Sequence, residues 1–585
     1  MEKDKRVDLF TLDIIKDSLH AIGEEMFISV ARSSKSPVIY EVLDFASGLT
    51  DAEGRLLTQG NGVTGFIGML SSMVKEVIDK FVKPGNIKEG DIIIINDPYG
   101  GGGSHLSDVG LVMPIYYEGN IVAFSANKAH WTEVGGKDPG SWTVDSTEIY
   151  QEGLQFPCVK ICNEGVMNEA LIDVIKANVR FPDLSIGDMW AQISGLKTGE
   201  KRVVELCDKF EKEIVLLAIE RLLKNSEELS RKQIMALPDG EYEAEDWIDD
   251  DGVGNGPFKV KVRVTIKGDE FIADFRGSQL QVPGPINVSF TGLLSAVRVI
   301  FLAATNPSQD VNDGVFSPLK IIVDDASIFN AERPAAVSTY WETMLYGIDL
   351  IWKALAPILP DRLTAGHLLS VCGFVLAGTH PDTKEPYIAV GPSLGGWGAG
   401  KGKDGENAQF CVADGETFNI PVEVLETRYG FFVEEYSLRA DGAGAGEYRG
   451  GSGVVRTYRM QNDGNFFTGT FGRFKFLPWG MAEGRDGSRN EFEILKADGT
   501  IDGPFGKYAR YPINKGDAVK MSTATGGGYG NPFNRTVEKV ILDVKNNFIT
   551  LDQAKEDYGV IIDPISFAVL DVTEARRHNE NIDII

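Results

Sequence analysis

The sequence predicts a multi-domain α+β protein built from glycine-rich mixed and antiparallel sheets with flanking helices. Its 585 residues exceed what one compact hydrophobic core accommodates. Segments of alternating apolar residues, which are typical of strands, occur between longer segments of helical periodicity. The chain also contains 66 glycines, a fraction well above the usual ~7%. We expect an N-terminal α/β domain over 1–235, a strand-rich middle domain over 236–380, and a glycine-rich β domain with a C-terminal helical segment over 381–585.

The N-terminal domain is expected to alternate between helices and strands. Apolar spacing predicts helices over 8–32 and 66–83, with strand segments around 38–59 between them. The stretch EGDIIIINDPYG predicts a buried strand that runs into a loop. The stretch LVMPIYYEGNIVAFSANKAH predicts a hairpin that turns at Glu118-Gly119-Asn120. Two long helical stretches are expected within 166–235, the second beginning with KRVVELCDKF, and Pro238-Asp239-Gly240 ends them.

The remainder of the chain is expected to be richer in strands. The stretches YEAEDWIDDD, FKVKVRVTIKG and EFIADFRG alternate like strands of an antiparallel sheet. A helix is expected over 341–358, and 536–559 has helical spacing. Glycines cluster in four segments: 100–103, 395–405, 442–453 and 526–530. Because aromatic and charged residues interleave with them, we expect ordered loops with close backbone approaches rather than flexible linkers.

Charge and composition exclude several classes of protein. The formal net charge of −27 would repel nucleic acid and anionic membranes. No apolar run approaches the roughly 20 residues that span a bilayer, and the charged N-terminus lacks the apolar segment of a signal peptide. We therefore expect a cytoplasmic protein with neither nucleic-acid nor membrane partners. The five cysteines contain no CxxC pair, which favours small buried residues over a disulfide framework or a zinc ribbon.

The segment GGGGSHLSDVG at 100–110 combines a glycine run with a histidine and an aspartate. A P-loop requires GxxxxGK[ST] and a dinucleotide site requires GxGxxG at the start of a helix, and neither pattern is present. His105 and His130 are two of only six histidines, and Asp108 follows His105 by three residues. In a turn, this spacing can build a mixed nitrogen and oxygen site for zinc, manganese or iron. On spacing alone, a local hydrogen-bonded His–Asp pair is the more common arrangement.

The stretch NDPYGGGGSHLSDVGLVMPIYYEGNIVAFSANKAHWTEVGGKDPGSW resembles the signature region of the hydantoinase B/oxoprolinase family. Ordered matches continue along the whole chain, including LDFASGLTDAEGRLLTQGNG, EIYQEGLQFP, LPDGEYEAEDWIDDDG, DFRGSQLQVPGPIN, DGETFNIPVEVLE, LRADGAGAGEYRGGSGVVRTYR and GGGYGNPFNR. So many matches in the same order make the resemblance highly specific.

The resemblance implies a metal-binding N-terminal domain and an ATP-binding partner. Asp44 in LDFASG, His105 and Asp108 in SHLSD, and His130 in KAHW match the family's metal ligands. The expected cofactor is a divalent metal, zinc first with manganese or iron as alternatives, and the glycine run would leave space around it. ATP would bind to a larger hydantoinase A-type subunit that phosphorylates a carbonyl or its enol, or activates bicarbonate. We expect an oligomer of such heterodimers.

Several polar residues near the signature are candidates for further roles. Glu133, Asp145, Glu148 or Glu152 could act as a general base or fix a histidine tautomer, with a solvated acidic loop as the alternative for each. Lys128 could point from the hairpin strand into the site and hold a phosphorylated intermediate, with a surface lysine as the alternative. Our catalytic candidates are Glu133, Lys128 and Asp145.

The chain also departs from many relatives at two places. It has GNGVTGFIG where they carry two histidines, and Trp131 where they carry one more. Trp131 could form an apolar wall for a hydrophobic substrate, or could serve packing alone. The resemblance thus implies a metal-binding subunit of an ATP-dependent hydrolase of cyclic amides such as a hydantoin, oxoproline or a lactam. The alternatives are a subunit of an ATP-dependent carboxylase of ketones such as acetone or acetophenone, and an assembly subunit with a degraded site.

Overall fold

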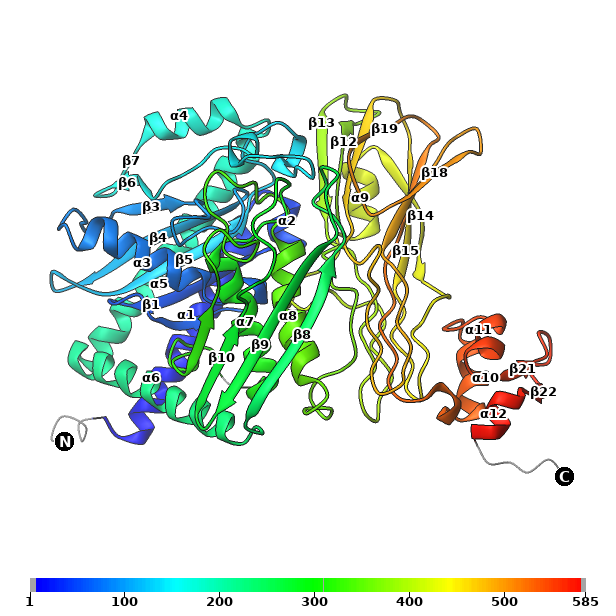
Figure 1. Ribbon diagram of the computed structural model, residues 1–585. Helices are drawn as coiled ribbons and strands as arrows, with labels where there is room; N and C mark the ends of the chain where they lie inside the picture. The colour runs from blue at the N-terminus through cyan, green and yellow to red at the C-terminus, as the bar shows by residue number, and fades with distance from the viewer. Residues whose placement is uncertain (1–6, 309, 580–585) are drawn as a thin grey trace.

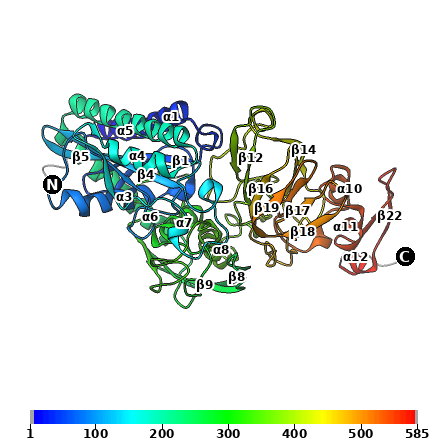
Figure 2. The ribbon, with the colours of Figure 1, turned by 90° about the horizontal axis from the view of Figure 1, so that it is seen from above.

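The structure is a computed structural model that describes residues 7–308 and 310–579 (Figure 1). The N-terminal half forms a large body of helices and sheets, two further sheets form a sandwich beside it, and a small module rich in helices lies at the C-terminal end (Figures 1 and 2). The chain is thus a multi-domain α+β protein. No helix within the described residues is both long and apolar enough to cross a membrane.

The N-terminal body is organised around a seven-stranded antiparallel sheet of order β2-β1-β5-β4-β3-β6-β7. Its strands are β1 (Phe45–Asp51), β2 (Leu56–Gln59), β3 (Ile92–Ile95), β4 (Asp108–Tyr117), β5 (Asn120–His130), β6 (Val159–Asn163) and β7 (Val166–Met167). The β4–β5 hairpin turns where it was expected, because Glu118 and Gly119 both adopt the positive φ that a tight hairpin turn requires.

Helices cover both faces of this sheet (Figure 2). Helix α1 (Leu9–Ser33) begins at Asp8, whose carboxylate accepts a 2.9 Å hydrogen bond from the Thr11 backbone N–H. It packs along α5 (Pro182–Phe210) on one face, and α3 (Met69–Val77) packs on the other. The remaining helices of this region are α2 (Pro37–Tyr40), α4 (Glu169–Asn178) and α6 (Lys212–Met235).

Two local expectations were wrong, and one helix was not expected. The strand expected from residue 38 starts only at Phe45, because Pro37 occupies the first helical turn and opens the short helix α2. The helix expected from Lys201 onward is two helices, α5 and α6, separated at Glu211, which has a φ of +65°. The structure also contains α7 (Phe290–Thr305), a buried helix that the sequence pattern did not identify.

A second sheet, of order β11-β10-β9-β8, belongs to the middle of the chain. Its strands are β8 (Gly240–Ile248), β9 (Phe258–Lys267), β10 (Glu270–Asp274) and β11 (Leu319–Ile322). The first three are antiparallel as expected, and β11 joins parallel to β10. Helix α8 (Trp341–Leu355) packs between this sheet and α7, and its N-terminal residues reach the candidate site described below.

Two antiparallel sheets build the sandwich, with orders β13-β12-β16-β19 and β14-β15-β20-β17-β18. The strands are β12 (Gly373–Thr379), β13 (Pro386–Gly391), β14 (Phe431–Leu438), β15 (Val454–Met460), β16 (Asn465–Thr470), β17 (Glu491–Leu495), β18 (Ile501–Phe505), β19 (Lys507–Ile513) and β20 (Ala518–Ser522), and α9 (Val422–Arg428) precedes β14. Aromatic pairs such as Phe374 with Tyr458 and Phe467 with Phe492 join the two sheets. The boundary expected at 380/381 falls inside the β12–β13 pair, and the three-domain division stays a prediction.

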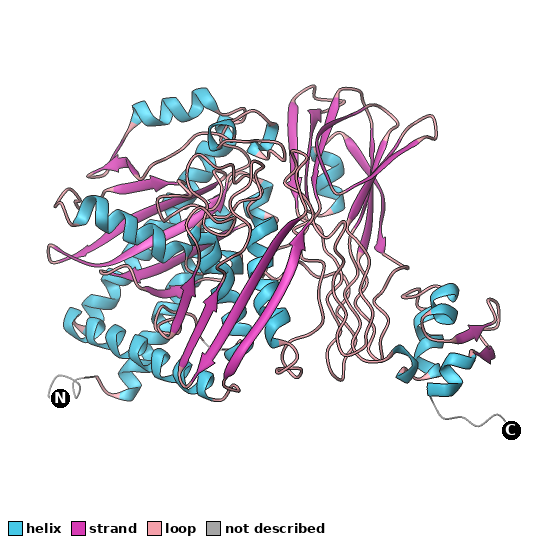
Figure 3. Cartoon of the chain, in the orientation of Figure 1, coloured by secondary structure: helices cyan, strands magenta, loops and turns pink. Residues whose placement is uncertain are grey.

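The three C-terminal glycine clusters form long loops that run side by side below the sandwich (Figure 3). A Cβ atom on Gly526 would lie 2.0 Å from the Trp397 carbonyl oxygen, and one on Gly450 would lie 1.9 Å from the Gly526 carbonyl oxygen. Only glycine allows backbones to approach so closely, so these loops are ordered as expected. The closing module contains α10 (Val537–Lys545), α11 (Leu551–Glu556), β21 (Val560–Ile562), β22 (Val569–Val572) and α12 (Glu574–Asn579).

Candidate metal centre

Three of the four expected metal ligands lie at neighbouring strand ends of the seven-stranded sheet. Asp108 is the first residue of β4 and His130 is the last residue of β5, and the two are direct cross-strand partners. Asp44 immediately precedes β1, and its carbonyl oxygen accepts a 3.0 Å hydrogen bond from the His130 backbone N–H. The antiparallel register therefore places these residues together at one end of three neighbouring strands.

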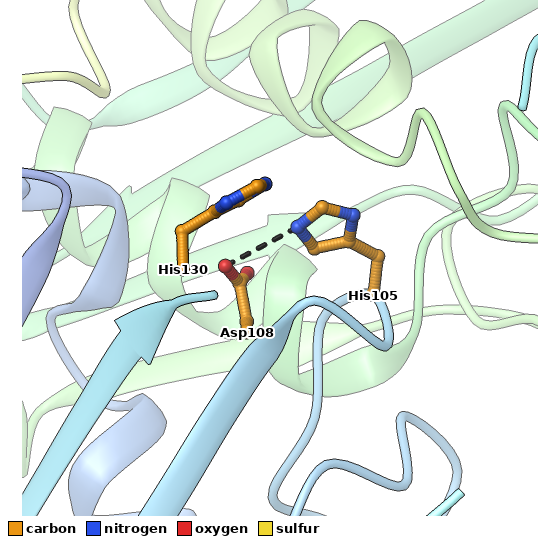
Figure 4. Close-up of side chains that lie close together, drawn as sticks. All are labelled: His105, Asp108 and His130. Carbon is orange, nitrogen blue, oxygen red and sulfur yellow. Dashed lines mark ion pairs between the residues drawn. The ribbon is translucent and has the colours of Figure 1, made fainter. Parts of the chain in front are cut away.

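His105 reaches the same point from the loop before β4 (Figure 4). Its Nε2 atom lies 3.2 Å from Asp108 Oδ1, and both side chains are buried. Ligand atoms of His105, Asp108 and His130 all lie within 4.8 Å of one another. The structure thus brings together the residues that sequence spacing suggested.

A hydrogen bond from the far side fixes the orientation of the His105 ring. Its Nδ1 atom lies 3.2 Å from the Ser338 carbonyl oxygen, which can only accept, so Nδ1 carries a proton there and Nε2 is the ring nitrogen that faces Asp108. The backbone N–H groups of Val337 and Ser338 in turn donate to the Glu152 carboxylate at 3.0 and 2.9 Å. Glu152, one of the acidic candidates near the signature, therefore supports His105 through the 337–338 backbone.

His130 is a buried histidine whose two ring nitrogens have no hydrogen-bond partner among the described residues. Burial and the neighbouring His105 lower its pKa to about 4, so it is neutral near pH 7. Burial alone would raise the pKa of Asp108, but His105, Lys128 and His130 outweigh it and hold the pKa below its usual range. Asp108 Oδ2 also accepts hydrogen bonds from the Ser104 hydroxyl and, at 3.3 Å, from the Tyr340 hydroxyl.

These groups line a small cavity of about 60 Å³. Besides His105, Asp108 and His130, the cavity is lined by the carboxylic acids Asp44 and Asp414. Its walls are otherwise mostly aromatic and aliphatic: Val63, Phe66, Trp142, Tyr340, Trp341, Met344, Val371 and Ala413. Burial and the charges of Asp108 and Asp414 raise the pKa of Asp44 well above its usual range, and burial raises the pKa of Asp414 to about 7.

The arrangement fits a divalent cation. Two imidazoles and two or three carboxyl groups converge in one buried cavity, and uncompensated carboxylates in such a place repel one another. His130 offers nitrogens that are unpartnered among the described residues, and His105 presents Nε2 to the cavity while its Nδ1 is bound to the Ser338 carbonyl. Mixed nitrogen and oxygen donors of this kind suit zinc, manganese or iron, and metal binding stays a prediction.

The glycine run does not provide the expected space at the centre. A Cβ atom on Gly103 would lie 2.5 Å from the Asn96 carbonyl oxygen, and one on Gly102 would lie 2.7 Å from the Ile95 side chain. The described lining of the cavity contains none of residues 100–103. These glycines instead let the loop pack against the end of β3, which positions His105 and Asp108.

Lys128 is buried, unlike a surface lysine. Its Nζ atom donates a 3.0 Å hydrogen bond to the Gly102 carbonyl oxygen. Burial lowers its pKa to about 8, while the Asp108 carboxylate opposes that shift. Lys128 thus ties the glycine run to β5 and adds positive charge beside Asp108. Whether it also acts in catalysis stays a prediction.

The other two catalytic candidates have partners of their own outside the cavity lining among the described residues. Glu133 is buried and forms a 2.7 Å ion pair with Arg180, whose backbone N–H also donates to it. Asp145 forms ion pairs with Lys137 and Arg510. These contacts favour structural roles for both acids.

Trp131 packs instead of lining the cavity. Its indole N–H donates a 2.8 Å hydrogen bond to Gln192 Oε1, and its ring contacts Phe156. The substituted GNGVTGFIG segment does reach the cavity, through Val63, Gly65 and Phe66. The departure at that segment therefore alters the cavity wall, whereas the departure at Trp131 alters the protein core.

Sequence reasoning missed Tyr340, Trp341 and Asp414, which complete the cavity. They lie more than 200 residues beyond His130 in the chain, and no ligand-like spacing links them to it. The only available signal was the motif DGETFNIPVEVLE, which begins at Asp414 and contributes to the family resemblance.

Comparisons with known proteins agree with the resemblance. The sequence profile described as hydantoinase B/oxoprolinase matches residues 8–532. A B-type protein from Pseudomonas sp. (strain NS671), proposed to belong to a D-/L-hydantoinase, is 32% identical over 583 residues, which cover 95% of this chain and 96% of that protein. The crystal structure of the ATP-dependent caprolactamase from Pseudomonas jessenii is similar with a TM-score of 0.90 at 28% identity, covering 98% of this chain and 99% of that chain.

A nucleotide-free structure of acetone carboxylase has a TM-score of 0.88, covering 98% of this chain and 84% of that chain. At 18% identity this likeness concerns the fold alone. The profile match spans most of the sequence, and a relative of similar length matches from end to end. The chain belongs to the hydantoinase B/oxoprolinase family.

Proposed function

We propose that this chain is the metal-binding subunit of an ATP-dependent cyclic amide hydrolase. The observation that carries the proposal is that His105, Asp108 and His130 offer ligand atoms within 4.8 Å of one another in a cavity that Asp44 also lines. The similar caprolactamase is ATP-dependent by name, and the similar hydantoinase protein is named as one subunit of its enzyme, which supports a separate ATP-binding partner. That partner would phosphorylate the amide carbonyl, and this chain would complete the hydrolysis.

The side chains of the cavity have distinct tasks in this proposal. Asp44, His105, Asp108 and His130 would hold the metal, which would act as a Lewis acid toward a substrate oxygen and would lower the pKa of water. The Ser338 carbonyl keeps His105 in the tautomer that presents Nε2. The aromatic walls exclude bulk water, which strengthens every electrostatic interaction inside the cavity.

A ketone carboxylase is the second candidate function. Val63 and Phe66, from the segment that differs from many relatives, give the cavity an apolar wall that would suit a ketone. The two functions would use the same site, but only the carboxylase would incorporate the carbon of bicarbonate into its product. Incorporation of labelled bicarbonate into an acid product from acetone or acetophenone would therefore select the carboxylase.

The test uses this chain purified together with its A-type partner. Metal content is measured by elemental analysis, and ATP-dependent hydrolysis is measured with hydantoin, 5-oxoproline and caprolactam. His130→Ala should lose both the metal and the hydrolysis. His367→Ala is the matched control, because His367 is also buried with an unpartnered Nε2 among the described residues but lies between Trp352 and Trp397.

The outcomes separate the candidates. Near-stoichiometric metal in the wild type and in His367→Ala, with loss of metal in His130→Ala, is the expected result. A wild-type complex that hydrolyses a cyclic amide without any bound metal would contradict the metal-binding role. A complex that holds metal but converts neither cyclic amides nor ketones would favour the alternative that this chain is an assembly subunit.

A further inference from the structure

Two polar groups in the cavity wall remain without partners after the metal residues are assigned. The atoms Asp414 Oδ2 and Trp341 Nε1 are both buried, although the Asp414 residue as a whole is half-buried, and neither atom has a hydrogen-bond partner among the described residues. Both residues line the same cavity as His105, Asp108 and His130. Leaving a buried donor or acceptor unpaired costs roughly 1–3 kcal/mol, so a molecule that pairs with both groups in this cavity would be favoured.

The pair consists of one acceptor and one donor. The carboxyl group of Asp414 can accept a hydrogen bond in either protonation state, and the indole N–H of Trp341 can only donate. A secondary cyclic amide presents the complementary groups, an N–H next to a carbonyl oxygen. A ketone presents the carbonyl oxygen alone and would leave the Asp414 acceptor unsatisfied.

We propose that Asp414 accepts a hydrogen bond from the ring N–H of a cyclic amide before its carbonyl is phosphorylated, and thereby selects secondary amides over ketones. This inference rests on the function proposed above and assigns its specificity to one residue. Discrimination of this kind is strong in an apolar cavity, because an analogue without the N–H leaves a buried polar group unpaired. The Cys411 thiol hydrogen-bonds to the Asp414 carboxyl group but leaves Oδ2 without a partner among the described residues, and Val371, Met344 and Ala413 in the same cavity have apolar side chains.

The position of Asp414 also suits a residue that senses the ring. The cavity of about 60 Å³ is well below the 300–1,000 Å³ of typical small-molecule sites, so a ring must displace part of the wall. Cys411, Val412 and Gly415, which neighbour Asp414 in the chain, line a second and larger pocket of about 460 Å³. Asp414 therefore belongs to a segment that lines two pockets.

The experiment compares caprolactam with cycloheptanone, a ketone of the same ring size in which a methylene replaces the N–H. Dissociation constants are measured by calorimetry on the metal-loaded complex of this chain with its A-type partner, for the wild type, Asp414→Ala and Asp414→Asn. The wild type should prefer caprolactam by about 10- to 100-fold, the range expected for one hydrogen bond to a charged group. Asp414→Ala should abolish the preference, and Asp414→Asn, which keeps an acceptor oxygen, should retain part of it.

Each other outcome overturns the inference. If Asp414→Ala still preferred caprolactam over cycloheptanone, another group would recognise the ring. If Asp414→Ala lost its metal together with the preference, Asp414 would be a metal ligand. Failure of the wild type to bind caprolactam, or equal affinity for both compounds, would remove the basis for N–H selection. Failure of the proposed function is recognised separately, because it appears as a metal-free or inactive wild-type complex before any variant is compared.

Discussion

Replacing Glu152 by alanine should weaken metal binding although Glu152 touches none of the expected ligands. Its carboxylate accepts hydrogen bonds from the backbone N–H groups of Val337 and Ser338 at 3.0 and 2.9 Å, and from the Ser146 hydroxyl at 2.7 Å. The carbonyl of Ser338 orients His105. The substitution therefore removes the support on which the His105 tautomer depends.

The magnitude follows from the groups left unpaired. Two buried backbone N–H groups lose their acceptor at roughly 1–3 kcal/mol each, so the folded state should lose about 2–6 kcal/mol. The Ser146 hydroxyl also loses its acceptor, although it still accepts a hydrogen bond from the Thr143 hydroxyl. Removing a group that orients a metal-ligating histidine typically costs about 10- to 100-fold in metal affinity, and we expect a loss in that range for Glu152→Ala.

The assay is a metal dissociation constant measured by competition with a chelator, alongside the calorimetric unfolding temperature of the same complex. Glu148→Ala is the matched control, because Glu148 is an exposed acid four residues away. Glu152→Gln should recover much of the affinity through its amide oxygen. The reasoning is refuted if Glu152→Ala unfolds at a lower temperature but binds metal as tightly as the wild type.

Two further predictions concern stability. Arg473 is buried and forms ion pairs with Asp246 at 3.0 Å and Asp349 at 2.7 Å, so Arg473→Ala should cost about 3–5 kcal/mol. It removes the cation that the two buried carboxylates share, although Lys353 and the Trp479 indole N–H remain as partners. The exposed Arg263→Ala should change the denaturation midpoint little, and equal effects of the two substitutions would contradict the reasoning. Burial raises the pKa of Glu342 to about 7, although Lys507 opposes it. The protonated Glu342 contributes its full stability below pH 4.5, and this contribution is lost as the pH rises through about 7. Between pH 4.5 and about 7 the wild type should therefore lose more stability than Glu342→Gln. Parallel curves of stability against pH for the two proteins would refute this.

The sequence by itself determined the local parts of this protein. The capped helix at the N-terminus, the β4–β5 hairpin and the ordered glycine loops follow from residue types whose preferences are local. The hairpin also determined half of the candidate site, since its register places Asp108 opposite His130. The three-residue separation of His105 and Asp108 needed only a turn to bring their side chains to 3.2 Å.

The tertiary structure decided which polar residues surround the centre. Tyr340 contacts Asp108 from 232 residues away in sequence, and Asp414 joins the cavity from a still more distant loop. The same packing paired Glu133 with Arg180, buried Lys128 and turned Trp131 into the core. Alternation and spacing indicate which face of a strand is buried, but they do not identify the segment that covers it. Burial and the charges of neighbours set the pKa and the partner of each group, and both depend on contacts between residues far apart in the chain.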